Sequence, residues 1–274
     1  MADLKITTGY SKNGLPYARM GSGSRILFII DGLDFSHKPP SGMELRLMTG
    51  FIKKLAGDFT IYQVRRKPGL PEGYSMRDMS DDCAVMIKDE FEGPVDIMGI
   101  STGGPIAQHF AVDHPDLVRR LVLAMTGYRL SENGKKLQRR VAELVREGKW
   151  RSAAALMSTA MFTGFTGLLF KSMFWLLGKV MFGSAASPSD GLVEIEAEDR
   201  HDFTERLAEI KVPTLVIGGD EDFFYPVRET AEGIPGSKLV LYQGVGHTAI
   251  MKREFGEDLL AFLTVDTGDE VEKE

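Results

Sequence analysis

The stretch VDIMGISTGGPIAQHF, residues 95–110, runs from a largely apolar segment through a serine flanked by glycines and back into apolar residues. Its first four residues favour a buried strand, and the residues after Pro105 are typical of a helix with proline in its first turn. Gly99, Ser101 and Gly103 therefore form the pattern G-x-S-x-G at a turn from strand to helix. In this position the pattern predicts a serine whose hydroxyl projects above the carboxyl edge of a sheet.

The glycines around Ser101 are expected because the turn leaves no room for larger residues. A serine at such a turn has to adopt a strained backbone conformation, and glycines on either side let strand and helix approach without a Cβ clash. A phosphate-binding loop would need a lysine after the second glycine group, and a dinucleotide site would need G-x-G-x-x-G; this stretch has neither. We therefore interpret Ser101 as a candidate nucleophile, with a turn that serves packing alone as the alternative.

Six short apolar runs are too continuous to have one wet face, and they predict buried, mostly parallel strands. They cover residues 26–30, 59–64, 95–98, 121–125, 214–217 and 239–242. Helical patterns alternate with them, at residues 43–55, 76–91, 105–112 and after the last run. This alternation predicts the α/β class with a mostly parallel, twisted sheet. The Asn13-Gly14 dipeptide predicts a turn between two antiparallel strands at the start of the fold.

Residues 128–203 interrupt the alternation because they contain no strand candidate. They comprise a basic amphipathic helix and then a stretch rich in methionine and phenylalanine. The charge-free residues 152–170 reach the length of a membrane span, but serine, threonine and glycine dilute them, and a single span would separate the two halves of the sheet. We therefore predict an α/β core of residues 1–127 and 204–274 with an inserted helical cap of residues 128–203. Peripheral contact of this cap with lipid stays open.

The composition excludes several classes of protein. The chain has 274 residues, of which 43% are hydrophobic, a net charge of −6 and a pI near 5.5. It can bury a large core, and it offers phosphate backbones no overall attraction, so we expect no nucleic-acid partner. Cys83 is the only cysteine, which excludes an internal disulfide and a cysteine-rich metal site. Since the first residues contain no apolar leader, we expect a cytoplasmic protein.

A serine hydroxyl needs a base to take its proton, and the base needs an acceptor that fixes its tautomer. Of the five histidines, His247 in GVGHTAI follows the last predicted strand on a glycine-rich loop, so it can reach the same sheet edge as Ser101. The acid should come from LVIGGDEDFFYP, after the preceding strand, which contains Asp220 and Asp222. Either aspartate gives the order Ser, Asp, His along the chain, and the residues alone leave the choice open.

Four stretches give the chain a resemblance to the α/β-hydrolase family over most of its length: GISTGG, HPDLVRRLVLA, VPTLVIGGDEDFFYP and GVGH. The resemblance implies that Asp222, in a G-x-x-D turn with Pro226 after it, is the acid, and that His247 is the base. It also implies that the insert is the family's usual cap. The serine distinguishes the chain from the family's dehalogenases and epoxide hydrolases, which resemble it in fold but use aspartate at this position.

The resemblance further implies an oxyanion hole built from the backbone N–H groups of Leu33 and Thr102. One residue departs from the family's pattern: many members carry His-Gly after the third strand, and this chain has Asp31-Gly32. Backbone donors need no particular side chain, so the hole can still form. A carboxylate aimed at the developing oxyanion would oppose catalysis, so we expect Asp31 to point away or to be hydrogen-bonded.

Together these residues predict a serine hydrolase that transfers an acyl group to water through an acyl-enzyme, without a metal or an organic cofactor. We expect a small carboxylic ester or thioester with an apolar part as its substrate. The residues predicted to contact it are Met161, Phe165, Phe174 and Phe223. The alternative for such an aromatic stripe is that the cap packs on itself.

Three alternative functions remain beside this prediction. A lactonase or a carbon–carbon bond hydrolase would use the same three residues. A receptor for a small ligand would keep the fold without the reaction, because fold alone proves no activity. Binding of nucleic acid or a membrane surface through the basic runs at residues 65–67 and 135–140 is the least favoured, because such runs are mostly solvated and the net charge is negative.

Overall fold

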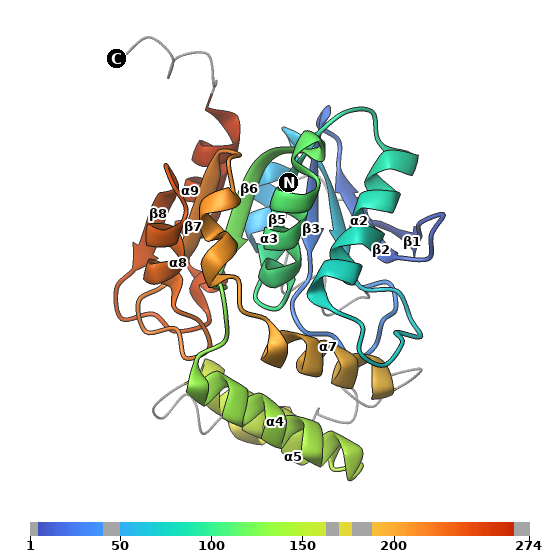
Figure 1. Ribbon diagram of the computed structural model, residues 1–274, viewed down its shortest axis with the longest axis vertical. Helices are drawn as coiled ribbons and strands as arrows, with labels where there is room; N and C mark the ends of the chain where they lie inside the picture. The colour runs from blue at the N-terminus through green and yellow to red at the C-terminus, as the bar shows by residue number, and fades with distance from the viewer. Residues whose placement is uncertain (1–4, 41–49, 163–169, 177–187, 266–274) are drawn as a thin grey trace.

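The computed structural model describes residues 5–40, 50–162, 170–176 and 188–265 (Figure 1). Most of the helix expected at residues 43–55 and the predicted substrate contact Phe165 lie outside these ranges. Residues 50–55, the end of that expected helix, are helical.

The centre of the molecule is an eight-stranded sheet in the order β1-β2-β4-β3-β5-β6-β7-β8. Strand β2 pairs antiparallel with both β1 and β4, and all other neighbours in the sheet are parallel. The strands are β1 Thr7–Tyr10, β2 Pro16–Gly21, β3 Arg25–Ile30, β4 Phe59–Val64, β5 Val95–Ile100, β6 Val118–Ala124, β7 Thr214–Gly219 and β8 Lys238–Tyr242. The predicted fold class is confirmed, and so is the antiparallel pair at its start.

Each side of the sheet has its own hydrophobic core. Phe28 and Ile30 of β3 pack with α2, α3 and α8, whereas Leu27 and Ile29 of the same strand pack on the other side with α9 and with the helical residues before Ala56. Since successive side chains of a strand point to opposite faces, a sheet covered on both faces needs continuous apolar strands. The helices of the two faces are α2 Met76–Glu90, α3 Gly103–Asp113, α8 Val227–Gly233 and α9 Phe255–Thr264, with 3₁₀ turns at Pro115–Leu117, Thr204–Glu209 and Ala249–Met251.

Helices α4, α5 and α7 come from the segment between β6 and β7, and Figure 1 shows them gathered at one end of the sheet. They cover Glu132–Arg146, Trp150–Met161 and Pro188–Arg200. They share a small hydrophobic cluster that also contains Phe35, from the loop after β3. The two ends of the segment lie side by side, because the Phe203 N–H donates to the Tyr128 carbonyl at 2.9 Å and Arg129 pairs with Asp202 in an antiparallel bridge. The chain thus returns to the sheet where it left it.

The charge-free run at residues 152–170 is not one continuous helix. Helix α5 contains its first part and ends at Met161, and residues 170–176 are helical again. Across the ranges that the structure describes, no helix combines the length and the apolar character needed to cross a membrane.

Candidate active site

The turn between β5 and α3 holds Ser101 in the left-handed region of backbone space, with φ of 52°. The glycines beside it are required by close contacts. A Cβ on Gly103 would lie 2.2 Å from the Ile30 carbonyl oxygen, and one on Gly104 would lie 2.1 Å from Thr126 Oγ1. Both distances are far below van der Waals contact, so the strained serine and its glycine neighbours form one tightly packed unit.

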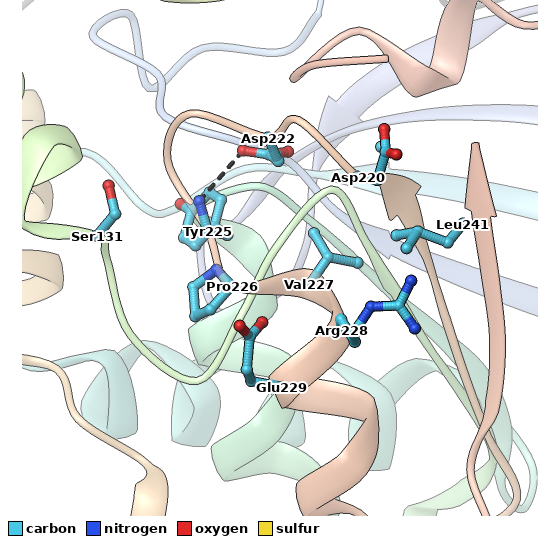
Figure 2. A pocket seen from close by; sticks show the side chains of 10 residues that line it. Ser131, Asp220, Asp222, Tyr225, Pro226, Val227, Arg228, Glu229 and Leu241 are labelled. Atoms are coloured by element: carbon cyan, nitrogen blue, oxygen red, sulfur yellow. Dashed lines mark hydrogen bonds between the residues drawn. The ribbon is translucent and has the colours of Figure 1, made fainter. Parts of the chain in front are cut away.

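Three side chains from three different turns form a hydrogen-bonded line. Ser101 Oγ lies 2.9 Å from His247 Nε2, and His247 Nδ1 lies 2.8 Å from Asp222 Oδ2. The other carboxylate oxygen of Asp222 accepts the backbone N–H groups of Phe224 and Tyr225, at 2.9 and 3.1 Å, and Figure 2 shows the second of these bonds. With Asp222 accepting at Nδ1, the imidazole has Nε2 available to accept the serine proton. The three residues predicted from sequence are therefore in contact.

The surroundings of the imidazole hold it in this line. The Phe224 ring lies 4.9 Å from the His247 ring in an edge-on arrangement, and the Tyr225 ring lies at 5.7 Å. The His247 residue is 8% exposed and the Asp222 side chain is 1% exposed. The hydrogen bond between these two side chains is therefore largely shielded from competing water.

The competing aspartate, Asp220, has a different partner. Its Oδ1 accepts the backbone N–H of Gly244 at 2.7 Å, and the residue is exposed. It joins the turns that follow β7 and β8 and does not contact the imidazole ring. In Figure 2 its carboxylate lies beside the end of β7, away from that of Asp222.

The loop after β3 lies against the serine. A Cβ on Gly32 would lie 3.3 Å from Ser101 Cβ, so the backbone of this loop approaches the serine closely. The Asp31 carboxylate is turned into hydrogen bonds with Gln63 Nε2, at 2.8 and 3.0 Å, and with Arg65 Nε at 3.1 Å. Burial raises the pKa of Asp31, and the neighbouring Arg65 opposes this shift. The hydrogen bonds that we expected for this carboxylate are present.

Two buried residues, Arg66 and Glu198, connect the site to α7. The sequence alone did not predict a role for either of them in the site. Arg66 donates hydrogen bonds to the carbonyls of Asp31 and Gly32 and to the carboxylate of Glu194. The sequence prediction treated residues 65–67 as a potential surface run; this was wrong for Arg65 and Arg66, which are buried among carboxylates and carbonyls.

Glu198 of α7 is the second such residue, and it is 0% exposed. Its carboxylate accepts hydrogen bonds from Thr102 Oγ1 at 3.0 Å, from Gln138 Nε2 at 2.8 Å and from the Tyr225 hydroxyl. Burial raises the pKa of Glu198, and these three donors oppose the shift. Its position in the sequence gives one signal: with Asp190 and Glu194 it forms a stripe at four-residue spacing, a pattern more typical of a solvated helix face.

The predicted substrate contacts have known packing partners where the structure describes them. Met161 and Phe223 are half-buried and pack against the hydrophobic cluster that contains Phe224. Phe174 is also half-buried, with its ring 6.2 Å from that of Phe162. These contacts are packing contacts, so the role of the three residues toward a substrate stays a prediction.

A cavity of about 300 Å³ lies beside the acid loop and shares Asp222 and Tyr225 with the site (Figure 2). Half of its other lining residues are polar, and they come from α8, from the start of α4 and from the end of β7. They include Ser131, Asp220, Arg228 and Glu229. Within the described residues, no three His, Cys, Asp or Glu side chains are grouped so that they could hold a metal ion.

Comparison with protein families gives a match over most of the chain. A family model described as alpha/beta hydrolase fold matches residues 27–254. A non-heme chloroperoxidase of Kitasatospora aureofaciens is 35% identical over 101 residues, which are 34% of this chain and 35% of that protein. A bifunctional esterase/perhydrolase of Acinetobacter calcoaceticus is 35% identical over 89 residues, 30% of this chain and 31% of that protein. The matches span about a third of the length of these two relatives.

Solved structures share the whole architecture. The enol-lactonase of Burkholderia xenovorans superimposes with a TM-score of 0.77 at 20% sequence identity. The superposition covers 94% of this chain and 100% of that one. At this identity the likeness concerns the fold.

Proposed function

We propose, since the chain belongs to the alpha/beta hydrolase fold family, that it is a serine hydrolase acting on a carboxylic ester or thioester of a small, partly apolar substrate. The observation that supports this most is the hydrogen-bonded line from Ser101 through His247 to Asp222, at 2.9 and 2.8 Å. The positive φ of Ser101 supports it as well, because a strained backbone at a polar residue is typical of functional sites.

In the proposed reaction Ser101 Oγ attacks the carbonyl carbon of the substrate while His247 Nε2 takes the hydroxyl proton. The imidazolium, held by Asp222, then gives this proton to the leaving alcohol or thiol, which departs and leaves the acyl group on the serine oxygen. Water attacks the acyl-enzyme in the second half, again losing its proton to His247, and the serine leaves with that proton as the carboxylic acid is released.

The negative charge of the tetrahedral intermediate is proposed to be held by the backbone N–H groups of Leu33 and Thr102. Two observations support this assignment. The loop of Gly32 approaches Ser101 closely, and Thr102 is the residue before α3, where the N–H groups of the first turn lack partners within the helix. Asp31 does not oppose the charge, because its carboxylate is engaged by Gln63 and Arg65.

Residues 128–203 are proposed to form a cap over this site, with the core made of residues 1–127 and 204–274. The bridge between Arg129 and Asp202 supports the boundaries, because it closes the segment at its base. The proposed contacts of the substrate's apolar part are Met161, Phe165, Phe174 and Phe223.

A second candidate follows from the relative named a bifunctional esterase/perhydrolase. In this reaction hydrogen peroxide would replace water as the acceptor of the acyl group, and the product would be a peracid. Wild-type protein given acetate and hydrogen peroxide should then form a peracid, which is detected because it oxidises bromide to hypobromite and the hypobromite halogenates a dye. Ester hydrolysis without peracid formation would exclude it.

Turnover of p-nitrophenyl acetate and p-nitrophenyl butyrate tests the proposed function. The wild-type protein should hydrolyse both esters, and Ser101→Ala should lose activity by about 10⁴-fold or more while it keeps the circular dichroism spectrum of the wild type. Equal inertness of both proteins toward esters, thioesters and lactones, together with saturable binding of an apolar ligand, would instead support the receptor alternative.

A further inference from the structure

Helix α7 turns three carboxylates toward the core of the molecule. Asp190, Glu194 and Glu198 follow one another at four-residue spacing, and all three are at most 1% exposed. Burying a carboxylate is costly unless it is hydrogen-bonded or paired with a cation, so the partners of each one show what holds it there. Those partners differ along the helix.

One partner of Glu198 is Thr102, the residue directly after the candidate nucleophile. Thr102 Oγ1 donates to Glu198 at 3.0 Å, which fixes the residue whose backbone N–H is one of the two proposed oxyanion donors. The same carboxylate accepts the hydroxyl of Tyr225, whose ring packs on His247. Glu198 is therefore hydrogen-bonded to one residue beside the nucleophile, Thr102, and to one residue beside the base, Tyr225.

Glu194 acts on the other proposed donor through Arg66. Its carboxylate accepts one arm of the Arg66 guanidinium, which also donates to the Gly32 carbonyl oxygen. In a trans peptide the carbonyl and the following N–H point in opposite directions. The described chain has no cis peptide bond, so with the Gly32 carbonyl turned to Arg66 the N–H of Leu33 points in the opposite direction, away from Arg66.

We infer that Glu194 and Glu198 are positioning residues that hold the two backbone donors of the oxyanion hole in their working orientation. The inference rests on the proposed function and extends it: α7 belongs to the insert, so two specific contacts of the insert with the core, Glu194 with Arg66 and Glu198 with Thr102, set the geometry of the hole. Neither carboxylate has to touch the substrate. Each acts through one intermediate group, Arg66 or the Thr102 side chain.

Asp190 provides the contrast that separates this role from simple anchoring. It accepts the backbone N–H groups of Gly69 and Leu70, at 2.9 and 3.0 Å. These contacts fasten the same helix to the core, and they involve neither oxyanion donor. Loss of Asp190 should therefore weaken the seating of α7 with little effect on the hole.

The test compares Glu194→Gln and Glu198→Gln with two matched controls, Asp190→Asn and Glu196→Gln. Glu196 lies on the outer side of α7, where it pairs with Arg146 at the surface. For each protein kcat and KM are measured on p-nitrophenyl butyrate. The inhibition constants of a trifluoromethyl ketone, which forms a tetrahedral oxyanion on the serine, and of the matched methyl ketone are measured as well.

We expect Glu194→Gln and Glu198→Gln to lower kcat by about 10- to 100-fold, because a misaligned oxyanion donor costs transition-state stabilisation. KM and the affinity for the methyl ketone should stay close to wild type, whereas the affinity for the trifluoromethyl ketone should fall in parallel with kcat. Asp190→Asn should lower the melting temperature and Glu196→Gln should change little, both with kcat near wild type. Thr102→Val, which removes the hydroxyl held by Glu198 and keeps the backbone N–H, should reproduce the kcat loss of Glu198→Gln.

Wild-type kcat and trifluoromethyl ketone affinity in folded Glu194→Gln, Glu198→Gln and Thr102→Val would overturn the positioning role and leave the proposed hydrolase intact. If a glutamine variant does not fold, Thr102→Val and Arg66→Lys decide the question, since they interrupt the two connections without changing α7. A wild-type protein that neither turns over esters nor binds the trifluoromethyl ketone would overturn both proposals together.

Discussion

The choice between two neighbouring aspartates shows how the fold assigns chemistry to one residue. Asp222 has two backbone N–H donors on one oxygen and the imidazole on the other, whereas Asp220 joins two turns at the surface. Only Asp222 is held so that it can fix the tautomer of His247. The two residues lie two positions apart and have the same chemistry, so they form a matched pair for mutation.

Asp222→Asn is expected to lower kcat on the order of 10³- to 10⁴-fold, because an amide at this position favours the wrong imidazole tautomer. Asp220→Asn should leave kcat near wild type, since it changes a surface turn. Steady-state kinetics on p-nitrophenyl butyrate checks both. An equal loss in the two variants, or a loss only in Asp220→Asn, would refute the assignment of the acid.

At the scale of single elements, the loop after β3 is joined to α7 by a buried histidine. His37 Nδ1 lies 2.9 Å from the Lys67 carbonyl oxygen, and Nε2 lies 2.6 Å from Glu194 Oε1. The ring is buried, its Nδ1 has the Lys67 carbonyl as a partner, and its Nε2 lies in ion-pair contact with the Glu194 carboxylate, so the surroundings favour the imidazolium. Burial lowers the pKa of His37, but the hydrogen bond and charge of Glu194 outweigh it, so the net shift is upward.

This shift predicts a stability that depends on pH. A histidine whose pKa is raised by folding contributes stability below its unfolded value of 6.5, and this contribution is lost as pH rises through the folded value. Urea unfolding should show that wild type loses free energy of unfolding above pH 6.5 relative to His37→Gln. Taking the difference between the two proteins removes the pH dependence of groups that do not interact with His37; the charged groups that face the ring are Asp34, Asp190, Glu194 and Arg66. A constant difference from pH 6 to 9 would contradict a charged His37.

Local chemistry made the strands and the serine turn predictable. Continuous apolar runs reveal strands that are buried on both faces, and the glycines around Ser101 reveal a turn where backbone atoms approach closely. The stripe on α7 was not predictable in the same way. Acidic residues four apart on a helix usually indicate a helix face in water. Here the carboxylates are buried because Arg66 and Thr102 donate hydrogen bonds to them, and these residues are brought close only by the tertiary structure.

The substrate contacts stay a prediction for a related reason. The aromatic residues of the insert can pack on one another or on a ligand, and their pattern in the sequence is the same in both cases. The ring of Phe162 stacks on that of Phe170 at 3.9 Å, which is packing within the insert. The preference for Asp222 over Asp220 came from the resemblance to the α/β-hydrolase family, because the residues alone left both aspartates possible.

Over the whole molecule, the arginines of the two basic runs are paired with acidic side chains or buried. Arg139 pairs with Asp199 at 2.8 Å and Arg140 with Glu143 at 2.6 Å on the surface of α4, and Arg65 and Arg66 are buried. The net charge of the chain is −6. A surface of this kind gives a polyanion no concentrated positive field.

We therefore expect no measurable binding to duplex or single-stranded oligonucleotides, or to anionic phospholipid vesicles, even at about 50 mM salt, where electrostatic binding is strongest. Fluorescence anisotropy and vesicle co-sedimentation check this. Binding that disappears as salt is raised would contradict this expectation, because it would show that the surface has a concentrated positive patch.

The central claim is that three side chains from distant parts of the chain act together as nucleophile, base and acid. A fluorophosphonate probe followed by mass spectrometry of the labelled peptides tests it most directly. The wild-type protein should carry the label on Ser101, and His247→Ala, which removes the base, should lose it. A label on another residue, or full labelling of Ser101 without His247, would contradict it.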